Sequence, residues 1–136
     1  MPRWLTRLHV WVYRRSGGRV LGRMGGQHVL LLQTTGRHSG RTRTTPVQYL
    51  GVDDTFVVVA SNAGAAQHPA WYLNLREHPE VEVQIKGEVF RATARDAQGD
   101  ERDRLWDQLV EVWPPYADYQ QRTDREIPVV VLERAG

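Results

Sequence analysis

Three strand-like runs follow one another between residues 28 and 61, and they constrain the fold more than any other feature of the sequence. Residues 28–35 and 55–61 contain continuous apolar stretches, so each should be a strand buried on both faces. Residues 44–52 alternate between apolar and polar types, which indicates a returning strand with one buried face. Asp53-Asp54 supplies a tight turn before the third run. The pattern predicts an antiparallel meander.

The second half of the chain adds three further strands and two main helices. A proline after His68 favours a helix from Pro69 to His78, and Asp100 can cap a helix over residues 101–113. Alternating or apolar runs predict strands near residues 81–86, 89–95 and 127–132. Strands and helices do not alternate, so a doubly wound sheet is not expected. The expected class is mainly β (α+β), a six-stranded β-barrel with helices at its openings.

A basic segment joins the first two predicted strands. Residues 34–46 contain three arginines, a histidine, a serine, several threonines and two glycines, and they contain no acid. Glycines allow close backbone approach, and guanidinium groups match phosphate and carboxylate oxygens in a bidentate manner. The segment therefore suits an anion with several oxygens. A solvated hairpin loop is equally compatible with this composition.

Charge is distributed unevenly along the chain. Residues 1–52 hold nine arginines and no acid, whereas residues 53–136 hold nine basic and sixteen acidic residues, a net charge of −7. The first part should meet an anionic partner. The acidic remainder opposes a nucleic-acid backbone, so no nucleic-acid partner is expected. There are no cysteines, and the five histidines lack carboxylates at ligand spacing, so no metal site is expected.

The first residues form a separate region in this interpretation. Residues 3–15 read as a helix with Trp4, Leu8 and Trp11 on one face and arginines on the other, as in interfacial helices. Docking on its own domain is the alternative. We expect residues 1–26 to be a basic amphipathic region and residues 27–136 to be the barrel domain. The absence of an apolar run of about 20 residues favours a cytoplasmic protein, with peripheral contact at the inner face of the membrane through residues 3–15.

Two further features could carry chemistry. Ser61 lies at a strand end beside small residues that let a ligand approach the backbone, although helix capping is an equally ordinary role. The aromatic residues Trp113, Tyr116 and Tyr119 follow a helix and a proline pair, and such rings can wall a pocket for a flat molecule. Ordinary core packing explains them equally well.

Four ordered motifs resemble the deazaflavin-dependent nitroreductase family of actinobacteria, also called F420-dependent quinone reductases. They are residues 31–46, residues 59–65, residues 68–83 and residues 113–129, the last including Trp113-Pro114-Pro115-Tyr116 and Asp124-Arg125-Glu126-Ile127-Pro128. The resemblance covers residues 28–134 nearly without gaps. It implies a split β-barrel like that of FMN-binding, pyridoxamine-oxidase-like proteins. It also implies coenzyme F420 (8-hydroxy-5-deazaflavin), with its anionic phosphodiester and oligoglutamate tail; FMN is the weaker alternative for this fold.

The resemblance assigns coenzyme-binding residues to four segments. By motif match these are Arg37, His38 and Ser39 at the phosphate and tail; Arg43, Thr44, Thr45, Pro46, Val47 and Gln48 along the coenzyme; Val59, Ala60, Ser61 and Asn62 at the edge of the ring system; and Ala70, Trp71, Tyr72, Leu73 and Asn74 closing over it.

The implied reaction is hydride transfer from the reduced coenzyme to a quinone, an activated enone or lactone, or a nitro compound. The acceptor gains negative charge, so Tyr116 and Ser61 are the predicted catalytic residues, as hydrogen-bond donors to the developing oxyanion or as a proton relay. Gln48, Trp113, Tyr116 and Tyr119 are the predicted acceptor-binding residues. Some relatives carry tyrosines at the positions of Gln48 and Trp113, which favours quinones, enones and lactones over bulky nitroimidazoles. The alternatives are a non-catalytic carrier of the coenzyme and a nucleic-acid or membrane-surface binding module.

Overall fold

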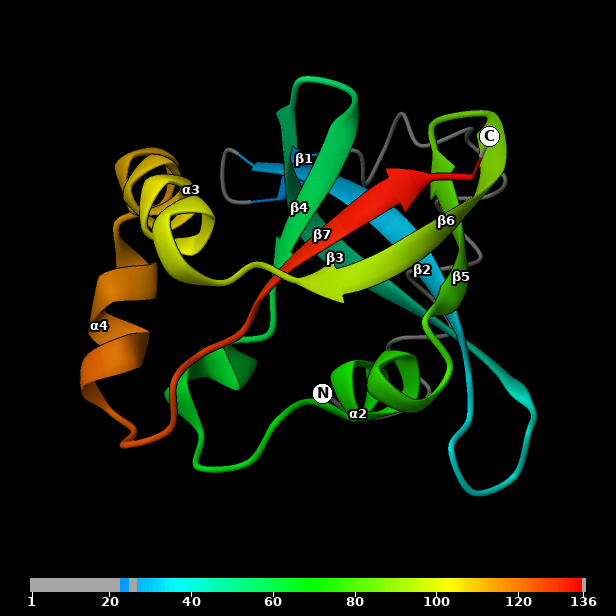
Figure 1. The fold of residues 1–136 in the computed structure, drawn as a ribbon, viewed down its shortest axis with the longest axis horizontal. Helices are drawn as coiled ribbons and strands as arrows, with labels where there is room; N and C mark the ends of the chain where they lie inside the picture. Colours follow the sequence, from blue (N-terminus) through cyan, green and yellow to red (C-terminus); the bar gives the residue numbers. More distant parts are fainter. Residues whose placement is uncertain (1–22, 25–26, 136) are drawn as a thin grey trace.

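The structure is a computed structural model that describes residues 23–24 and 27–135 (Figure 1). The helix predicted over residues 3–15 lies outside the described residues. The predicted boundary after residue 26 also adjoins residues that are not described. Six strands form the barrel: β2 (Gln27–Thr35), β3 (Thr42–Val52), β4 (Thr55–Val59), β5 (Glu80–Ile85), β6 (Glu88–Asp96) and β7 (Val129–Arg134).

The barrel is antiparallel throughout and closes on itself. The strand order is β1-β2-β3-β4-β7-β6-β5, and β5 pairs back onto β2 through Leu31–Gln33 opposite Glu82–Gln84. The two-residue strand β1 (Arg23–Met24) pairs with the start of β2. The predicted meander and the split-barrel fold class are both confirmed, because the first three long strands pair as consecutive hairpins.

Two apolar clusters explain why some strands are buried on both faces. Alternate residues such as Leu30, Leu32 and Val58 point into the barrel, where they are completely buried. The intervening residues of β4 and β7, such as Val57 and Val131, pack outward against helices instead. Fully burying one such side chain contributes about 1.5–3 kcal/mol. The continuous apolar runs in these two strands therefore follow from packing on both sides.

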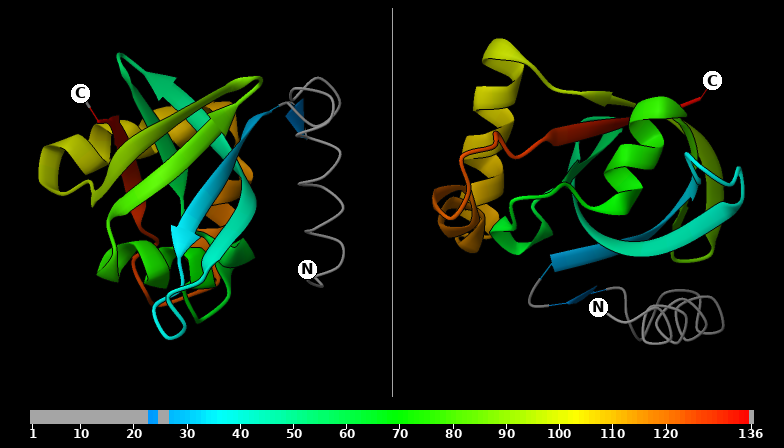
Figure 2. Two further views of the ribbon diagram at one scale, coloured as in Figure 1. Left: turned by 90° about the vertical axis from the view of Figure 1, so that its right-hand side faces the viewer. Right: turned by 90° about the horizontal axis from the view of Figure 1, so that it is seen from below.

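Helices cover the end and one side of the barrel. The helix α2 (Ala70–Glu77) lies across one opening, which Figure 2 shows from below. Helices α3 (Gly99–Val112) and α4 (Pro115–Gln121) pack beside β4 and β7, on the outward-facing cluster (Figure 1). A 3-10 turn, η1 (Asn62–Gly64), connects β4 towards α2.

Three predicted boundaries are wrong in detail. The helix α3 begins at Gly99 with Gln98 at its N-cap, so Asp100 does not cap it but sits in the first turn, where its charge favours the helix dipole. Pro69 occupies the N-cap of α2 rather than its first helical position. Strand β4 ends at Val59 and not at Ser61, because the chain turns into a left-handed conformation from Asn62 onward.

The barrel is opened by an early separation of two neighbouring strands. Strand β3 pairs with β4 through only three residue pairs, from Leu50–Val57 to Val52–Thr55. From Val58 to Val59, strand β4 pairs with β7 but no longer with β3. The lower part of β3, residues 44–50, is half-buried on both of its faces. The split therefore leaves a surface between β3 and the segment that follows β4.

Gly64 is required where that segment meets α4. Its φ is +81°, and a Cβ atom there would lie 2.7 Å from the carbonyl oxygen of Tyr119. We expect Gly64→Ala to lower the free energy of unfolding by about 2–4 kcal/mol, since it adds a left-handed side chain and a steric overlap. Gly51→Ala is the control, because nothing lies within 4 Å of its added Cβ. Urea denaturation measures both variants, and equal stabilities would contradict the prediction.

Candidate functional site

The basic loop between β2 and β3 is closed by its own backbone. The Gly36 N–H donates to the carbonyl oxygen of Arg41 at 2.7 Å, and the Gly40 N–H donates to that of Gly36 at 2.9 Å. The Arg41 N–H donates to the hydroxyl oxygen of Ser39 at 3.2 Å. Residues 38–43 are exposed. The loop is thus held in one shape while its cationic side chains face solvent.

Asn74 ties this loop to α2. Its side chain is 5% exposed, and its Oδ1 accepts the backbone N–H of Arg37 at 3.1 Å and the Arg37 Nη1 at 3.4 Å. Its Nδ2 donates to the buried Thr34 hydroxyl at 3.3 Å. The amide of Asn74 therefore orients the loop and Arg37, and its predicted contact with the coenzyme stays a prediction.

The predicted coenzyme-binding residues of β3 alternate between the two faces of the strand. Val47 packs against the barrel interior, so Thr45 and Arg43 share its side of the strand. Leu50 packs on the outward cluster, so Pro46, Gln48 and Thr44 share that side. Residues from one continuous motif therefore reach two different surfaces.

The hydroxyl group of Tyr116 meets Gln48 on the outward side. Tyr116 is 6% exposed, and its hydroxyl donates to Oε1 of Gln48 at 3.3 Å. Its ring lies 6.2 Å from that of Tyr119, edge to face, and 6.4 Å from that of Trp106. Burial, with a smaller effect of Tyr119, raises the pKa of Tyr116 to about 12. The phenol therefore remains a hydrogen-bond donor at neutral pH.

Trp113, the other predicted acceptor-binding aromatic residue before the proline pair, is half-buried against the same outward cluster.

The segment after β4 begins with a small buried residue, Ala60, and then carries the Ser61 hydroxyl. Val59 and Ala60 are buried, and both backbone groups of Ala60 are occupied, its N–H by the carbonyl of Pro128 and its carbonyl by Arg125. The Ser61 side chain makes no capping hydrogen bond to η1, which leaves its hydroxyl available within the described chain. The Asn62 Nδ2 donates to the carbonyl of Gln67 at 3.0 Å.

Helix α2 presents two kinds of residue. Ala70 is exposed and Trp71 is half-buried, so both are accessible. Tyr72 is 4% exposed and belongs to the inner cluster, and its hydroxyl donates at 2.7 Å to Oδ2 of Asp96, an exposed residue at the end of β6. The coenzyme contact predicted for Tyr72 stays a prediction. Trp71 and Leu73 are both half-buried, and both pack against the inner cluster.

Sequence reasoning missed the role of Arg125. Its guanidinium donates to the carbonyl oxygens of three residues in the segment after β4, namely Ala60, Ser61 and Ala65, at 2.7–3.2 Å. It also lies 3.0 Å from Nδ1 of His68. The only sequence signal was its place in the fourth family motif, which says nothing of these partners.

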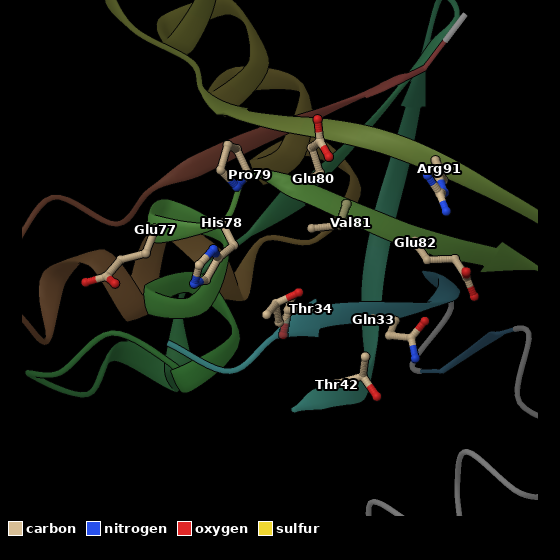
Figure 3. A pocket seen from close by; sticks show the side chains of 11 residues that line it. Gln33, Thr34, Thr42, Glu77, His78, Pro79, Glu80, Val81, Glu82 and Arg91 are labelled. Carbon is tan, nitrogen blue, oxygen red and sulfur yellow. The ribbon is translucent and has the colours of Figure 1, made fainter. Parts of the chain in front are cut away.

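A cleft of about 540 Å³ lies where the end of β2 meets β5 and the end of α2, away from β4 (Figure 3). Its lining includes Glu77, Glu80, Glu82, His78 and Arg91, together with threonines from β2 and β3. None of the predicted coenzyme-binding residues lines it. Three carboxylates there disfavour an anionic ligand. Among the described residues, no cluster of three or more His, Asp or Glu side chains could hold a metal ion.

The geometry defines a class of protein. It is a small antiparallel split barrel with a cationic loop that is tied to α2 through Asn74, and with a buried phenol, that of Tyr116, on α4. Such a surface can hold a flat molecule with an anionic tail and place hydrogen-bond donors near its ring.

Comparison with known proteins identifies the family. The model of the family "F420H(2)-dependent quinone reductase" matches residues 4–134. The F420H(2)-dependent quinone reductase Rv1261c of Mycobacterium tuberculosis is 41% identical over 134 residues, covering 96% of this chain and 90% of that relative. The solved structure of an F420-H2 dependent reductase (FDR-A) is 42% identical and has a TM-score of 0.71, covering 77% of this chain and 93% of that one. A solved domain-swapped dimer is 35% identical with a TM-score of 0.72, covering 96% and 97%.

The chain belongs to the F420H2-dependent quinone reductase family. The resemblance inferred from the four motifs is therefore confirmed, and the expected cofactor, coenzyme F420, is the coenzyme of this family. In the described part of the chain, no helix has the length and apolar character needed to cross a membrane.

Alkaline pH should destabilise the protein through two buried tyrosines. Burial raises the pKa of Tyr72 and Tyr116 to about 12, whereas an unfolded tyrosine titrates near 10. The unfolded chain thus loses these protons first, and stability should fall as the pH rises from about 10 to about 12. The double variant Tyr72→Phe/Tyr116→Phe should show a shallower decline. Urea denaturation across this range measures it, and an unchanged slope would contradict the assignment.

Proposed function

We propose that this protein catalyses hydride transfer from reduced coenzyme F420 to a small quinone. Membership of the family is the observation that carries this proposal, and the basic loop and the Ser61–Tyr116 region support it. Activated enones and lactones are proposed as further acceptors, and bulky nitroimidazoles are not favoured. Gln48 and Trp113 underlie that preference, since they occupy positions where some relatives have tyrosine.

The charge of the described residues fits the anionic handle of the coenzyme. Arg37 is oriented by Asn74, and Arg43 lies opposite Thr34 on the neighbouring strand. Residues 27–52 contain no acid, so nothing in this hairpin opposes phosphate or carboxylate groups. We assign Arg37, His38 and Ser39 to the phosphate and tail, with Arg43 and residues 44–48 alongside the remainder of the coenzyme.

The proposed roles of Tyr116 and Ser61 follow from their donors. The bound coenzyme supplies a hydride at C5 of its ring. The acceptor then needs a hydrogen bond where negative charge develops. Tyr116 donates only a long hydrogen bond to Gln48 in the free protein, so its O–H can turn to an acceptor oxygen. Its raised pKa makes it a hydrogen-bond donor and not a proton source. Ser61 supplies the second hydroxyl.

Binding and turnover can be tested separately. Fluorescence titration with coenzyme F420, with FMN as the control, measures binding. Loss of the absorbance of the reduced coenzyme only when both the protein and menadione are present measures reductase activity. Binding without turnover would indicate a non-catalytic carrier. No binding of the coenzyme, together with a salt-sensitive shift of an oligonucleotide, would indicate a nucleic-acid binding module.

Charge reversal in the basic loop should weaken coenzyme binding. We expect Arg37→Glu/Arg43→Glu to raise the Kd of coenzyme F420 by about 100-fold or more, since each charge-assisted hydrogen bond contributes about 1.5–3 kcal/mol. Arg91→Glu/Arg104→Glu changes the net charge equally at exposed positions outside the loop and serves as the control. Fluorescence titration measures all three proteins. Equal affinities for the two double variants would refute the loop assignment.

Removing the Tyr116 hydroxyl should affect turnover more than binding. We expect Tyr116→Phe to lower kcat by about 100- to 1,000-fold, as loss of an oxyanion donor does, and to change the coenzyme Kd by less than about threefold. Tyr49→Phe is the control, because Tyr49 packs against the barrel interior between His28 and Phe56. Equal losses of kcat and affinity would argue against the proposed role.

A further inference from the structure

The segment between β4 and α2 adopts a conformation that needs external support. Asn62, Ala63 and Gly64 follow one another with φ of 47°, 53° and 81°. Only the last is a glycine, and a left-handed conformation costs an ordinary residue roughly 1–2 kcal/mol. Such local strain persists where the surroundings hold it in place, and it is often found at functional sites.

Arg125 contacts this strained turn from both ends. On the leading side, its Nη2 donates to the carbonyl oxygen of Ser61 at 2.7 Å and its Nη1 to that of Ala60 at 3.2 Å. On the trailing side, its Nε donates to the carbonyl oxygen of Ala65 at 2.9 Å. The planar guanidinium has five N–H donors in a fixed fork, which a lysine ammonium cannot reproduce.

The backbone of Arg125 is held in turn by its neighbours on the chain. The Arg125 carbonyl accepts Gln120 Nε2 at 2.7 Å, and the Gln120 Oε1 accepts the Ile127 N–H at 2.9 Å. Gln120 belongs to α4, the helix that carries Tyr116. The arginine thus joins the segment with Ser61 to the helix with the other predicted donor.

His68 completes the contact set as an acceptor. Arginine can only donate, so the His68 Nδ1 at 3.0 Å from Nη1 must be unprotonated. Burial, together with Arg125 and Arg76, lowers the pKa of His68, whereas Asp96 opposes the shift. The Tyr72 ring packs against it at 4.8 Å. Protonation in acid would remove the acceptor and set two cations against each other.

We propose that Arg125 is a positioning residue for the reductase, fixing the backbone of residues 60–65 so that Ser61 faces the coenzyme ring in register with Tyr116 on α4. This inference rests on the proposed function. Arg125 touches neither the coenzyme nor the acceptor in this assignment; it acts through the carbonyls that it holds.

Arg125→Lys tests the proposal, with Arg102→Lys as the matched control. Arg102 is similarly enclosed and holds the same C-terminal segment, through the Ile127 carbonyl at 2.7 Å and Glu126 at 2.8 Å, but it does not contact residues 60–68. We expect amide hydrogen exchange of residues 61–66 to accelerate by about tenfold or more in Arg125→Lys, with the barrel strands unchanged. We also expect kcat to fall by about tenfold or more with the coenzyme Kd changed by less than about threefold.

The outcomes separate this inference from the proposed function. If the wild-type protein reduces menadione and Arg125→Lys matches Arg102→Lys in both exchange and kcat, the positioning role is wrong. If coenzyme affinity and kcat both fall in Arg125→Lys, so that Kd rises while kcat drops, Arg125 belongs to coenzyme binding and the proposal is also wrong. If the wild-type protein shows no reductase activity but exchange of residues 61–66 still accelerates, the proposed function fails while the support of the loop by Arg125 stands.

A second variant checks the histidine contact without disturbing the arginine. In the wild-type protein, protection of residues 61–66 should hold at a pH of about 7.5 and fall at a pH of about 5, because the lowered pKa of His68 places its protonation below the ordinary value of about 6.5. In His68→Gln an amide oxygen can accept from Arg125 at both pH values, so the fall should disappear. An identical fall in both proteins would overturn the assignment of His68 as the acceptor.

Discussion

The short ladder between β3 and β4 is the constraint on which the rest of this structure depends. The two strands pair through three residues and then part, because β4 follows β7 while β3 continues down to the basic loop. In a fully paired barrel of this size, side chains would fill the interior, and only the two ends would be open to a ligand. The separation instead leaves β3 half-buried on both faces and brings Gln48 near Tyr116. Gln48 and Tyr116, two residues of the proposed site, meet beside this separation.

Charge then divides the surface around the basic hairpin. On the side of the split, arginines are displayed on a loop without acids; on the other side, three glutamates line a cleft beside β5. An anionic ligand is therefore drawn to one side of the hairpin and repelled from the other. Asn74 also sets the direction of the charge, because it holds both the loop backbone and the Arg37 side chain against α2. The fold therefore determines where the Arg37 guanidinium lies as well as the sign of the charge in the loop.

The strands and the fold class could be predicted from the sequence because they depend on local periodicity and turn chemistry. Alternation in residues 44–52 and the Asp53-Asp54 turn are properties of adjacent residues. Other features depend on contacts between distant segments. Asn74 reaches a loop 37 residues away, Tyr72 donates to Asp96 24 residues away, and Arg125 binds carbonyls 60 to 65 residues away. Asp100 failed as a cap because the neighbouring Gly99, with φ of +60°, already begins the helix. No pattern along the chain encodes these pairings.

The support of residues 60–65 has a consequence for how such a protein can diversify. Arg125 holds this segment through main-chain carbonyls, which every amino acid possesses. Side chains at exposed positions next to the left-handed turn, such as 65 and 66, can therefore be exchanged by mutation while the path of the backbone is retained. A lineage built on this scaffold can thus vary the chemistry of this surface through a few side chains, without redesigning the barrel that presents them.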